Sequence, residues 1–593
     1  MPVEVRKKAL EKLEHEAFEK YRGHFSKNSN GETLTSVEIS DLPLEAINEL
    51  ARVAAELKDR TLSRSVKVFL AARDGDFTHA LPNLKAAKDV LFRYLRKDTI
   101  DGWVYVRNKA GELTPELVTG ISVQMESPPG RRVYLAIETT ASTHDDSNKR
   151  GYKVAPRSFR HDFLAEDVVN RTVPEILGAA GIFKETPELK AEYEDAIRRH
   201  VDEIMPSFAE QFRFTGTPVK TDSWSRPTNP VENRKVINDL EMKDYAPITS
   251  FAHSPLLVDP EADGDGGREP NGSIPLHPVI RVFDLKTYEF YWLDSRSVTA
   301  YVYNEKLAEK LVLPATHRDL LDVLTNDLSS FTGDIIEGKG TGNVILCTGT
   351  PGLGKTLTAE VYAETLKRPL YAIHSGNLGT TASEVEKGLA TIFAQATRWN
   401  AILLLDESDV FVMERRDSLE VNAVVAVFLR SMEYFNGLMF MTTNRHGNID
   451  DAILSRCLAI VRFHTPDTDG ARSIWKMMST ELGQPLADAL VDELVTSFPD
   501  AAGRDIKQLC GTVFRMVKGG SWKLDGDSFR RAAMFRGVDM LRNFGKGQVA
   551  GVEDAEIATL IIKAQDTIER EMGFRPSPSD AMKYVMKKAA LAA

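Results

Sequence analysis

The stretch NVILCTGTPGLGKT, residues 343–356, decides the fold that this sequence predicts. An apolar run leads into the glycine-rich pattern GxxxxGK followed by Thr, and the helically spaced TLTAEVYAETLK comes next. A strand, a glycine-rich turn and a helix in this order form a phosphate-binding loop. The backbone N–H groups of such a turn face phosphate oxygens, and the positive end of the helix dipole adds to the attraction.

Each part of this loop has an expected role. Gly349, Gly352 and Gly354 let the backbone curl around the phosphates, and Lys355 reaches the β- and γ-phosphates. Thr356 offers its hydroxyl to Mg²⁺, so we expect ATP and Mg²⁺ as the bound groups. The predicted nucleotide-binding residues are Gly349, Thr350, Pro351, Gly352, Leu353, Gly354, Lys355, Thr356 and Leu357.

Two further apolar runs end in polar side chains. AILLLDESD, residues 401–409, fits a strand buried on both faces of a parallel sheet. It ends in Asp406, expected to hold Mg²⁺ with Thr356, and in Glu407, expected to polarise the attacking water. GLMFMTTN, residues 437–444, repeats the pattern, and Asn444 is expected at the carboxyl edge of the sheet, where ligands of open α/β folds bind.

Two arginines complete the predicted site. Arg456, in IDDAILSRCLAIVRF, lies far from its own phosphate loop in the predicted order but can reach the nucleotide of a neighbouring subunit. A guanidinium supplied in this way stabilises charge on the γ-phosphoryl group. Arg504, in AAGRDIKQLC, can reach back over the nucleotide from a helical lid. The alternatives are a surface salt bridge for Arg456 and an ordinary first-turn residue for Arg504.

Taken in order, these motifs resemble those of the AAA+ ATPases, over roughly residues 305–545. Within that superfamily, RWNAILLLDESDVF and FLRSMEYFNGLMFMTTNR are similar to a poorly characterised group of single-domain AAA ATPases abundant in fungi. The resemblance implies an α/β fold, namely a P-loop NTPase αβα core with a helical lid, behind a mixed α+β N-terminal module. It also implies a homo-oligomeric ring, usually a hexamer, with nucleotide at each subunit interface.

The sequence departs from the family pattern in three places, one of which is Thr350 and Ser408 at positions where the family often has Pro and Ala. SGNLGTTASEVEKGL, residues 375–389, lacks the aromatic residue with which threading unfoldases grip a chain. ILSRC is similar to the SRC motif of sliding-clamp loaders, whose arginine acts in trans. We therefore expect an ATPase that remodels a protein or macromolecular complex, with an unidentified client bound by the N-terminal module. A nucleic-acid machine of the clamp-loader or replication type and a nucleotide-gated scaffold are the alternatives.

Changes in periodicity and composition divide the chain. Apolar residues at helical spacing dominate up to about residue 98, alternation follows, and DPEADGDGGREPNGSIP is an acidic linker. The predicted organisation is a helical region over 1–98, a mixed α/β module over 99–258, a linker over 259–275, a β-strand collar over 276–304, the nucleotide-binding αβα subdomain over 305–470, a helical lid over 471–545 and a helical C-terminal extension over 546–593.

Composition restricts partners and location. The 593 residues carry a formal net charge of -11, which disfavours nucleic acid as a partner because phosphate binding needs excess Lys and Arg. Three cysteines occur without metal-ligand or CxxC spacing, which suits a reducing compartment. The N-terminus has no apolar signal-peptide region, and no apolar run approaches the ~18 residues that a membrane helix needs. The expected location is cytoplasmic.

Overall fold

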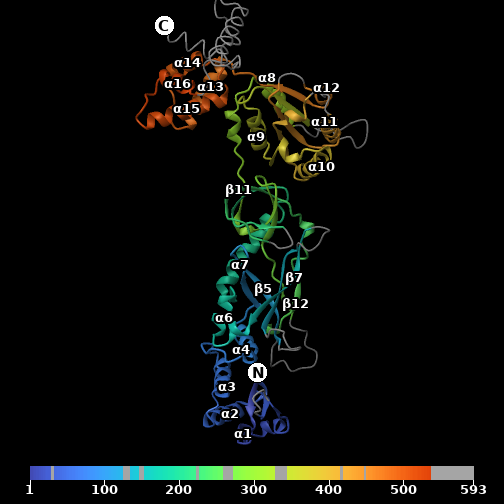
Figure 1. Cartoon of the computed structure of the whole chain (residues 1–593), viewed down its shortest axis with the longest axis vertical. Coiled ribbons are helices and arrows are strands. Elements are labelled where there is room, and N and C mark those ends of the chain that lie inside the picture. Colours follow the sequence, from blue (N-terminus) through green and yellow to red (C-terminus); the bar gives the residue numbers. More distant parts are fainter. Residues whose placement is uncertain are drawn as a thin grey trace, which may run out of the picture.

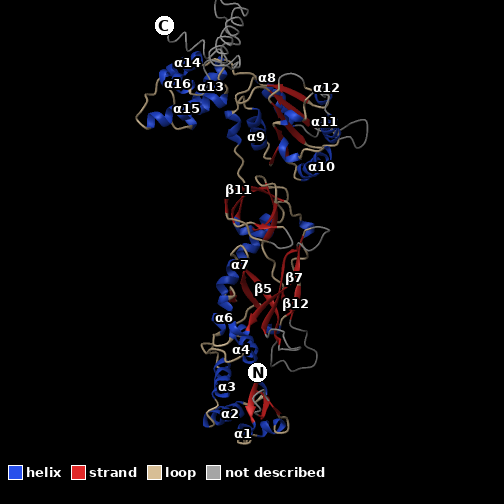
Figure 2. Ribbon diagram, viewed as in Figure 1, coloured by secondary structure: helices blue, strands red, loops and turns tan. Residues whose placement is uncertain are grey.

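The computed structural model shows modules that follow one another along the long axis of the molecule, with the last two side by side at one end (Figure 1). It describes residues 1–27, 33–124, 134–145, 152–221, 226–257, 271–326, 343–413, 419–445 and 449–535. Strands occur in every module except the last described one, which is helical (Figure 2). The predicted extension over 546–593, and most of the predicted linker over 259–275, lie outside the described residues.

The first module combines helices with a small sheet. Its elements are β1 (Pro2–Arg6), α1 (Lys7–Leu10), β2 (Ser26–Lys27), β3 (Thr33–Glu38), α2 (Leu44–Glu56), α3 (Arg60–Arg73) and α4 (Leu84–Arg96). The strand order is β1-β3-β2, with both pairs antiparallel. The region over 1–98, predicted as helical, therefore also contains three strands. Val3 and Val5 of β1 are buried against α2 and α3, and this long-range packing is not visible in local spacing.

The second module is built on a five-stranded antiparallel sheet. Its elements are β4 (Trp103–Arg107), β5 (Leu113–Gln124), β6 (Tyr134–Asp145), β7 (Lys153–Leu164), α5 (Ala165–Val168), α6 (Val173–Ala179), β8 (Ile182–Lys184) and α7 (Pro187–Arg199). The order is β7-β6-β5-β4-β8, so the first four strands form the meander that the alternation predicts. A short π-helix, His200–Ile204, extends α7.

A six-stranded antiparallel sheet follows. Its strands are β9 (Gln211–Gly216), β10 (Val219–Lys220), β11 (Val231–Asn238), β14 (Val279–Asp284), β15 (Phe290–Asp294) and β16 (Val298–Ala300). The order is β10-β15-β14-β11-β9-β16, so strands from before and after the predicted linker share one sheet. The pair β12 (Phe251–His253) and β13 (Asn271–Ser273) stands apart from it.

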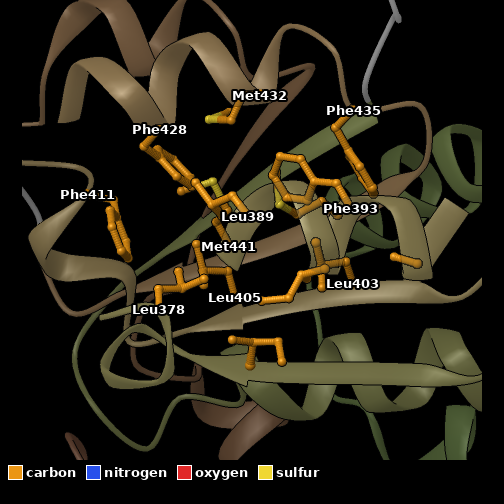
Figure 3. Close-up of a cluster of buried hydrophobic side chains, with 14 of the residues drawn as sticks. Leu378, Leu389, Phe393, Leu403, Leu405, Phe411, Phe428, Met432, Phe435 and Met441 are labelled. Carbon is orange, nitrogen blue, oxygen red and sulfur yellow. The ribbon is translucent and has the colours of Figure 1, made fainter. Parts of the chain in front are cut away.

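The phosphate-loop sequence lies in a parallel α/β layer, which confirms the predicted fold class. Its elements are α8 (Ala315–Asn326), β17 (Asn343–Thr348), α9 (Lys355–Thr365), β18 (Leu370–His374), α10 (Ala382–Arg398), β19 (Ile402–Asp406), α11 (Leu419–Met432), β20 (Leu438–Thr443), α12 (Asp451–Leu454) and β21 (Ala459–Arg462). The order is β18-β19-β20-β17-β21, with every pair parallel. Helices α10 and α11 cover one face through a core of Leu, Phe and Met side chains (Figure 3).

A bundle of four helices closes the described chain. These are α13 (Thr468–Glu481), α14 (Asp488–Ser497), α15 (Gly503–Lys518) and α16 (Gly526–Met534). Trp475, fully buried, lies at the centre of their core. We call this bundle the lid because α13 and α15 face the phosphate loop. Among the residues that the structure describes, no helix is both long and apolar enough to cross a membrane.

Candidate active site

The phosphate loop joins β17 to α9 at the carboxyl edge of the parallel sheet. Gly349 adopts a φ of +152°, and a Cβ atom there would lie 2.7 Å from the Phe463 carbonyl oxygen. Only glycine fits this turn without moving the backbone at Phe463, just after β21. The Lys355 ammonium donates to the carbonyl oxygens of Gly349 and Thr350 at 2.7 and 2.9 Å. Burial lowers the pKa of Lys355, and the nearby charge of Asp406 opposes this in part.

Asp406 and Thr356 meet at the end of β19. The Thr356 hydroxyl donates to Asp406 Oδ1 at 3.0 Å. Carboxylate and hydroxyl oxygens are ligands that Mg²⁺ accepts, and it commonly takes one or two protein ligands together with phosphate oxygens. In the described part of the chain, no group of three or more His, Cys, Asp or Glu side chains suits a metal. The two oxygens therefore fit Mg²⁺ bound together with a nucleotide.

Glu407 follows Asp406 in a left-handed backbone conformation, with φ +53° and ψ +45°. A residue with a Cβ atom rarely adopts this conformation, which here turns the chain sharply at the end of the strand. Its backbone N–H donates to the Thr442 hydroxyl oxygen at 3.0 Å, and that hydroxyl in turn donates to Asp406. The hydroxyl of Ser408 donates to the Thr442 carbonyl oxygen at 2.8 Å.

Asn444 lies beside the lysine of the phosphate loop. Its side-chain oxygen accepts from the Lys355 ammonium at 3.0 Å, which links the end of β20 to the start of α9. Its backbone N–H donates to Asp409 Oδ1 at 3.0 Å, and the Thr443 hydroxyl donates to the same oxygen. The structure thus brings together Lys355, Thr356, Asp406, Glu407 and Asn444.

Sequence reasoning missed the residues that hold this group in place. Thr442, Ser408 and Asp409 form hydrogen bonds between the ends of β19 and β20, more than 30 residues apart in the chain. Hydroxyl groups on two consecutive threonines at the end of a buried strand, in MTTN, are the only local signal for this arrangement. These threonines can bond to Asp406 and Asp409 only if β19 and β20 are neighbours in the sheet. The local sequence does not encode that pairing.

A cleft of about 1260 Å³ opens between the parallel sheet and the lid. Lys355, Asp406, Glu407 and Asn444 line one side, and the lid faces them. Arg504 lines the cleft from the first turn of α15. Its backbone N–H donates to the Gly352 carbonyl oxygen at 3.2 Å, so the lid contacts the phosphate loop directly.

Arg456 lies just after α12 and outside the lining of this cleft. Its Nε and Nη2 donate to Glu433 Oε1, and its Nη1 donates to the Ala452 carbonyl oxygen at 2.9 Å. About a third of the Arg456 side chain is exposed. This position is compatible with a surface salt bridge and with contact to a neighbouring subunit. Three of the five N–H groups of Arg456 form these bonds with described residues, and two are left for another partner.

Comparisons with known proteins show which proteins this chain is similar to. Residues 345–465 match the model of the ATPase family associated with various cellular activities, abbreviated AAA. A putative 26S proteasome regulatory subunit homolog from Methanothermobacter thermautotrophicus is 32% identical over 172 residues, covering 28% of this chain and 46% of that protein. Spastin from Anopheles gambiae is 27% identical over 220 residues, covering 35% of this chain and 25% of spastin.

Among solved structures, the AAA domain of FIGL-1 is 18% identical and superposes with a TM-score of 0.33, covering 46% of this chain and 92% of that chain. The chain spans less than half the length of the two curated relatives named above.

Proposed function

Because the chain carries an AAA domain and is an AAA+ ATPase, we propose that it couples hydrolysis of Mg·ATP to remodelling of a protein or macromolecular complex. The working form is a ring of identical subunits, six in the simplest case. The client binds to the modules built from residues 1–300. We also propose a cytoplasmic location, which suits three cysteines that are all unpaired.

The convergence of five side chains at one sheet edge carries this proposal. Lys355, Thr356, Asp406, Glu407 and Asn444 come from the ends of two parallel strands and the start of one helix, and they line one cleft. Catalysis of phosphoryl transfer depends mainly on positioning and on stabilising charge, and this arrangement supplies both.

Each of these residues has a task in the proposed reaction. Lys355 and the loop N–H groups hold the phosphates, and Thr356 with Asp406 would hold Mg²⁺, which neutralises phosphate charge when bound. Glu407 accepts a proton from the attacking water, and Asn444 orients that water. Arg504 contacts the nucleotide from the lid. Arg456 completes the site of the neighbouring subunit.

Exposed apolar side chains on two separate surfaces support a ring. Leu458 directly precedes β21, the outer strand of the parallel sheet, and Ile460 lies on it. Both side chains are exposed. Met534 and Phe535, at the end of α16 in the lid, are exposed as well. Two different apolar surfaces on one subunit suit head-to-tail contacts, which close into a ring when the rotation allows it.

The loop after β18 supports remodelling without aromatic threading. Leu378 is the only large apolar residue in SGNLGTT, and it is 2% exposed. It packs with Leu405 and Phe411 in the core that Figure 3 shows. The exposed residues of this segment are polar or glycine, including Gly376, Asn377 and Thr380. We therefore expect contact with a folded client through the N-terminal modules and polar groups.

The substitution Glu407→Gln tests the proposed chemistry. It removes the proton acceptor while keeping the size of the side chain, so turnover should fall by ~10²-fold or more with ATP affinity retained. Steady-state phosphate release and binding of a fluorescent ATP analogue measure the two effects. Lys355→Ala should lose both binding and turnover. Most of the wild-type turnover persisting in Glu407→Gln would remove Glu407 from the reaction.

A further inference from the structure

Glu364, in the last turn of α9, occupies an unfavourable place for a carboxylate. The C-terminal end of a helix carries partial negative charge, so a cation and not an anion stabilises it there. Glu360, one turn earlier, adds a like charge at a spacing that destabilises a helix. Glu364 is nevertheless buried, with 9% of the residue exposed. Its position therefore calls for partners outside α9.

Those partners come from the six-stranded sheet and the segment that leaves it. The Tyr301 hydroxyl and the Lys235 ammonium of β11 donate to Glu364 Oε1, at 2.5 and 3.3 Å. The Asn304 backbone N–H donates to the other carboxylate oxygen at 2.8 Å. The ammonium of Lys235 also lies 4.6 Å from the centre of the Tyr301 ring. One carboxylate on α9 is thus held from two places in the preceding module.

The segment that holds Glu364 continues directly to the nucleotide cleft. After β16, residues 301–304 contact Glu364, and the short helix Glu305–Lys310 then runs beside α9. Glu305 pairs with Lys367, just beyond α9, at 2.7 Å. Residues 311–314 come next and line the cleft. The first residues of α9, Lys355 and Thr356, line the same cleft, so both ends of this helix are connected to it.

We propose that Glu364 couples nucleotide binding to the six-stranded sheet, by transmitting movement of α9 to Tyr301, Asn304 and Lys235. This inference rests on the proposed function, since it assigns the route by which the ATPase site reaches the client-binding modules. Glu364 is a positioning residue: it lies on α9, contacts the six-stranded sheet and the segment after it, and lies outside the cleft lining.

Other contacts keep the six-stranded sheet attached when this connection is removed. Asp239, directly after β11, accepts from the Trp399 indole N–H at 2.7 Å and from Arg398 at 3.2 Å. Phe283 of β14 lies 4.7 Å from Trp399, centre to centre. Tyr288 donates to the Ala372 carbonyl oxygen on β18 at 2.8 Å. A change at Glu364 therefore leaves a large apolar and polar contact in place.

Hydrogen exchange followed by mass spectrometry on the full chain tests the proposal. In the wild type, a non-hydrolysable ATP analogue should slow amide exchange in residues 231–238 and 298–304 by ~5-fold, the lower end of ordinary coupling between sites. Glu364→Gln and Tyr301→Phe should each abolish most of this change, while the analogue still protects the phosphate loop. Tyr288→Phe is the matched control, because it removes a contact with β18 and leaves α9 untouched.

The outcomes separate this inference from the proposed function. An analogue that fails to protect the phosphate loop of the wild type overturns both. A protected phosphate loop with no change in residues 231–238 and 298–304 overturns the coupling alone. The coupling is also overturned if Glu364→Gln and Tyr301→Phe keep the full change, or if Tyr288→Phe removes it equally.

Discussion

At the scale of single residues, the site depends on a strained backbone at Glu407. Its left-handed conformation is unfavourable by roughly 1–2 kcal/mol for a residue with a Cβ atom, so surrounding bonds must maintain it. The Thr442 hydroxyl does so, because it accepts from the Glu407 N–H and donates to Asp406. One hydroxyl group thereby ties the backbone of Glu407 to the carboxylate of Asp406.

Thr442→Val tests this role with a side chain of the same shape. It leaves the Glu407 N–H without a partner and removes a hydrogen bond to a carboxylate. The free energy of unfolding should fall by about 1–3 kcal/mol. We expect kcat to fall by ~10-fold or more. Urea unfolding and steady-state ATPase assays measure the two effects.

Thr391→Val serves as the control for that substitution, because it makes the same change at a threonine whose hydroxyl donates to the Lys387 carbonyl oxygen at 2.9 Å, within α10. Its kcat should stay close to that of the wild type. An unchanged kcat in Thr442→Val would show that the hydroxyl is dispensable for positioning Asp406 and Glu407.

At the scale of elements, local sequence predicts some segments and misses others. Apolar runs such as AILLLD and GLMFMTT predict buried parallel strands, because a strand covered on both faces needs apolar residues at every position. The sheet over 1–38 escapes prediction since β1 and β3 pair across some 30 residues. The phosphate loop is predictable because its chemistry lies within eight residues. The hydrogen bonds to Glu364 join positions 60 to 129 residues apart, so local sequence does not predict them.

The π-helix after α7 is another element that spacing does not reveal. It begins with His200, which is fully buried, and neither ring nitrogen has a hydrogen-bond partner among the described residues. Its nearest ring neighbour is Tyr245, at 5.8 Å between centres. Burial lowers the pKa of His200 from 6.5 to about 4, and the charge of Asp294 opposes this only in part.

The lowered pKa of His200 predicts that the folded protein loses stability in acid. Between pH 6.5 and pH 4 the unfolded chain binds a proton at His200 that the folded protein does not, so stability falls as the pH falls. At pH 5 the loss from this residue is about 2 kcal/mol relative to neutral pH. His200→Phe should remove that part of the loss, because an apolar ring leaves no group to protonate.

Urea unfolding of both proteins at pH 7.5 and pH 5 measures the difference. His277 is also buried, and burial lowers its pKa. It is present in both proteins, so its contribution to the loss of stability cancels in the comparison. An equal loss of stability on acidification in His200→Phe and in the wild type would contradict the assignment.

At the scale of the whole molecule, the ATPase core and the modules that precede it lie in sequence along one axis (Figure 1). The six-stranded sheet stands between them and contacts the core through Glu364, Trp399 and β18. Arg456 lies outside its own cleft, held by Glu433 on the surface of the subunit. We propose that in a ring this arginine acts on the nucleotide of a neighbouring subunit.

The most direct test of the shared site is the ATPase rate per subunit as a function of protein concentration, for the wild type and for Arg456→Ala. The wild-type rate should rise cooperatively as subunits assemble. Arg456→Ala should bind ATP and remain slower by ~10³-fold at every concentration, because the γ-phosphoryl charge lacks its guanidinium. Arg430→Ala, at an exposed arginine paired with Glu386, is the control and should behave as the wild type. A rate per subunit that stays constant down to the monomeric range, with Arg456→Ala fully active, would contradict a site shared between subunits.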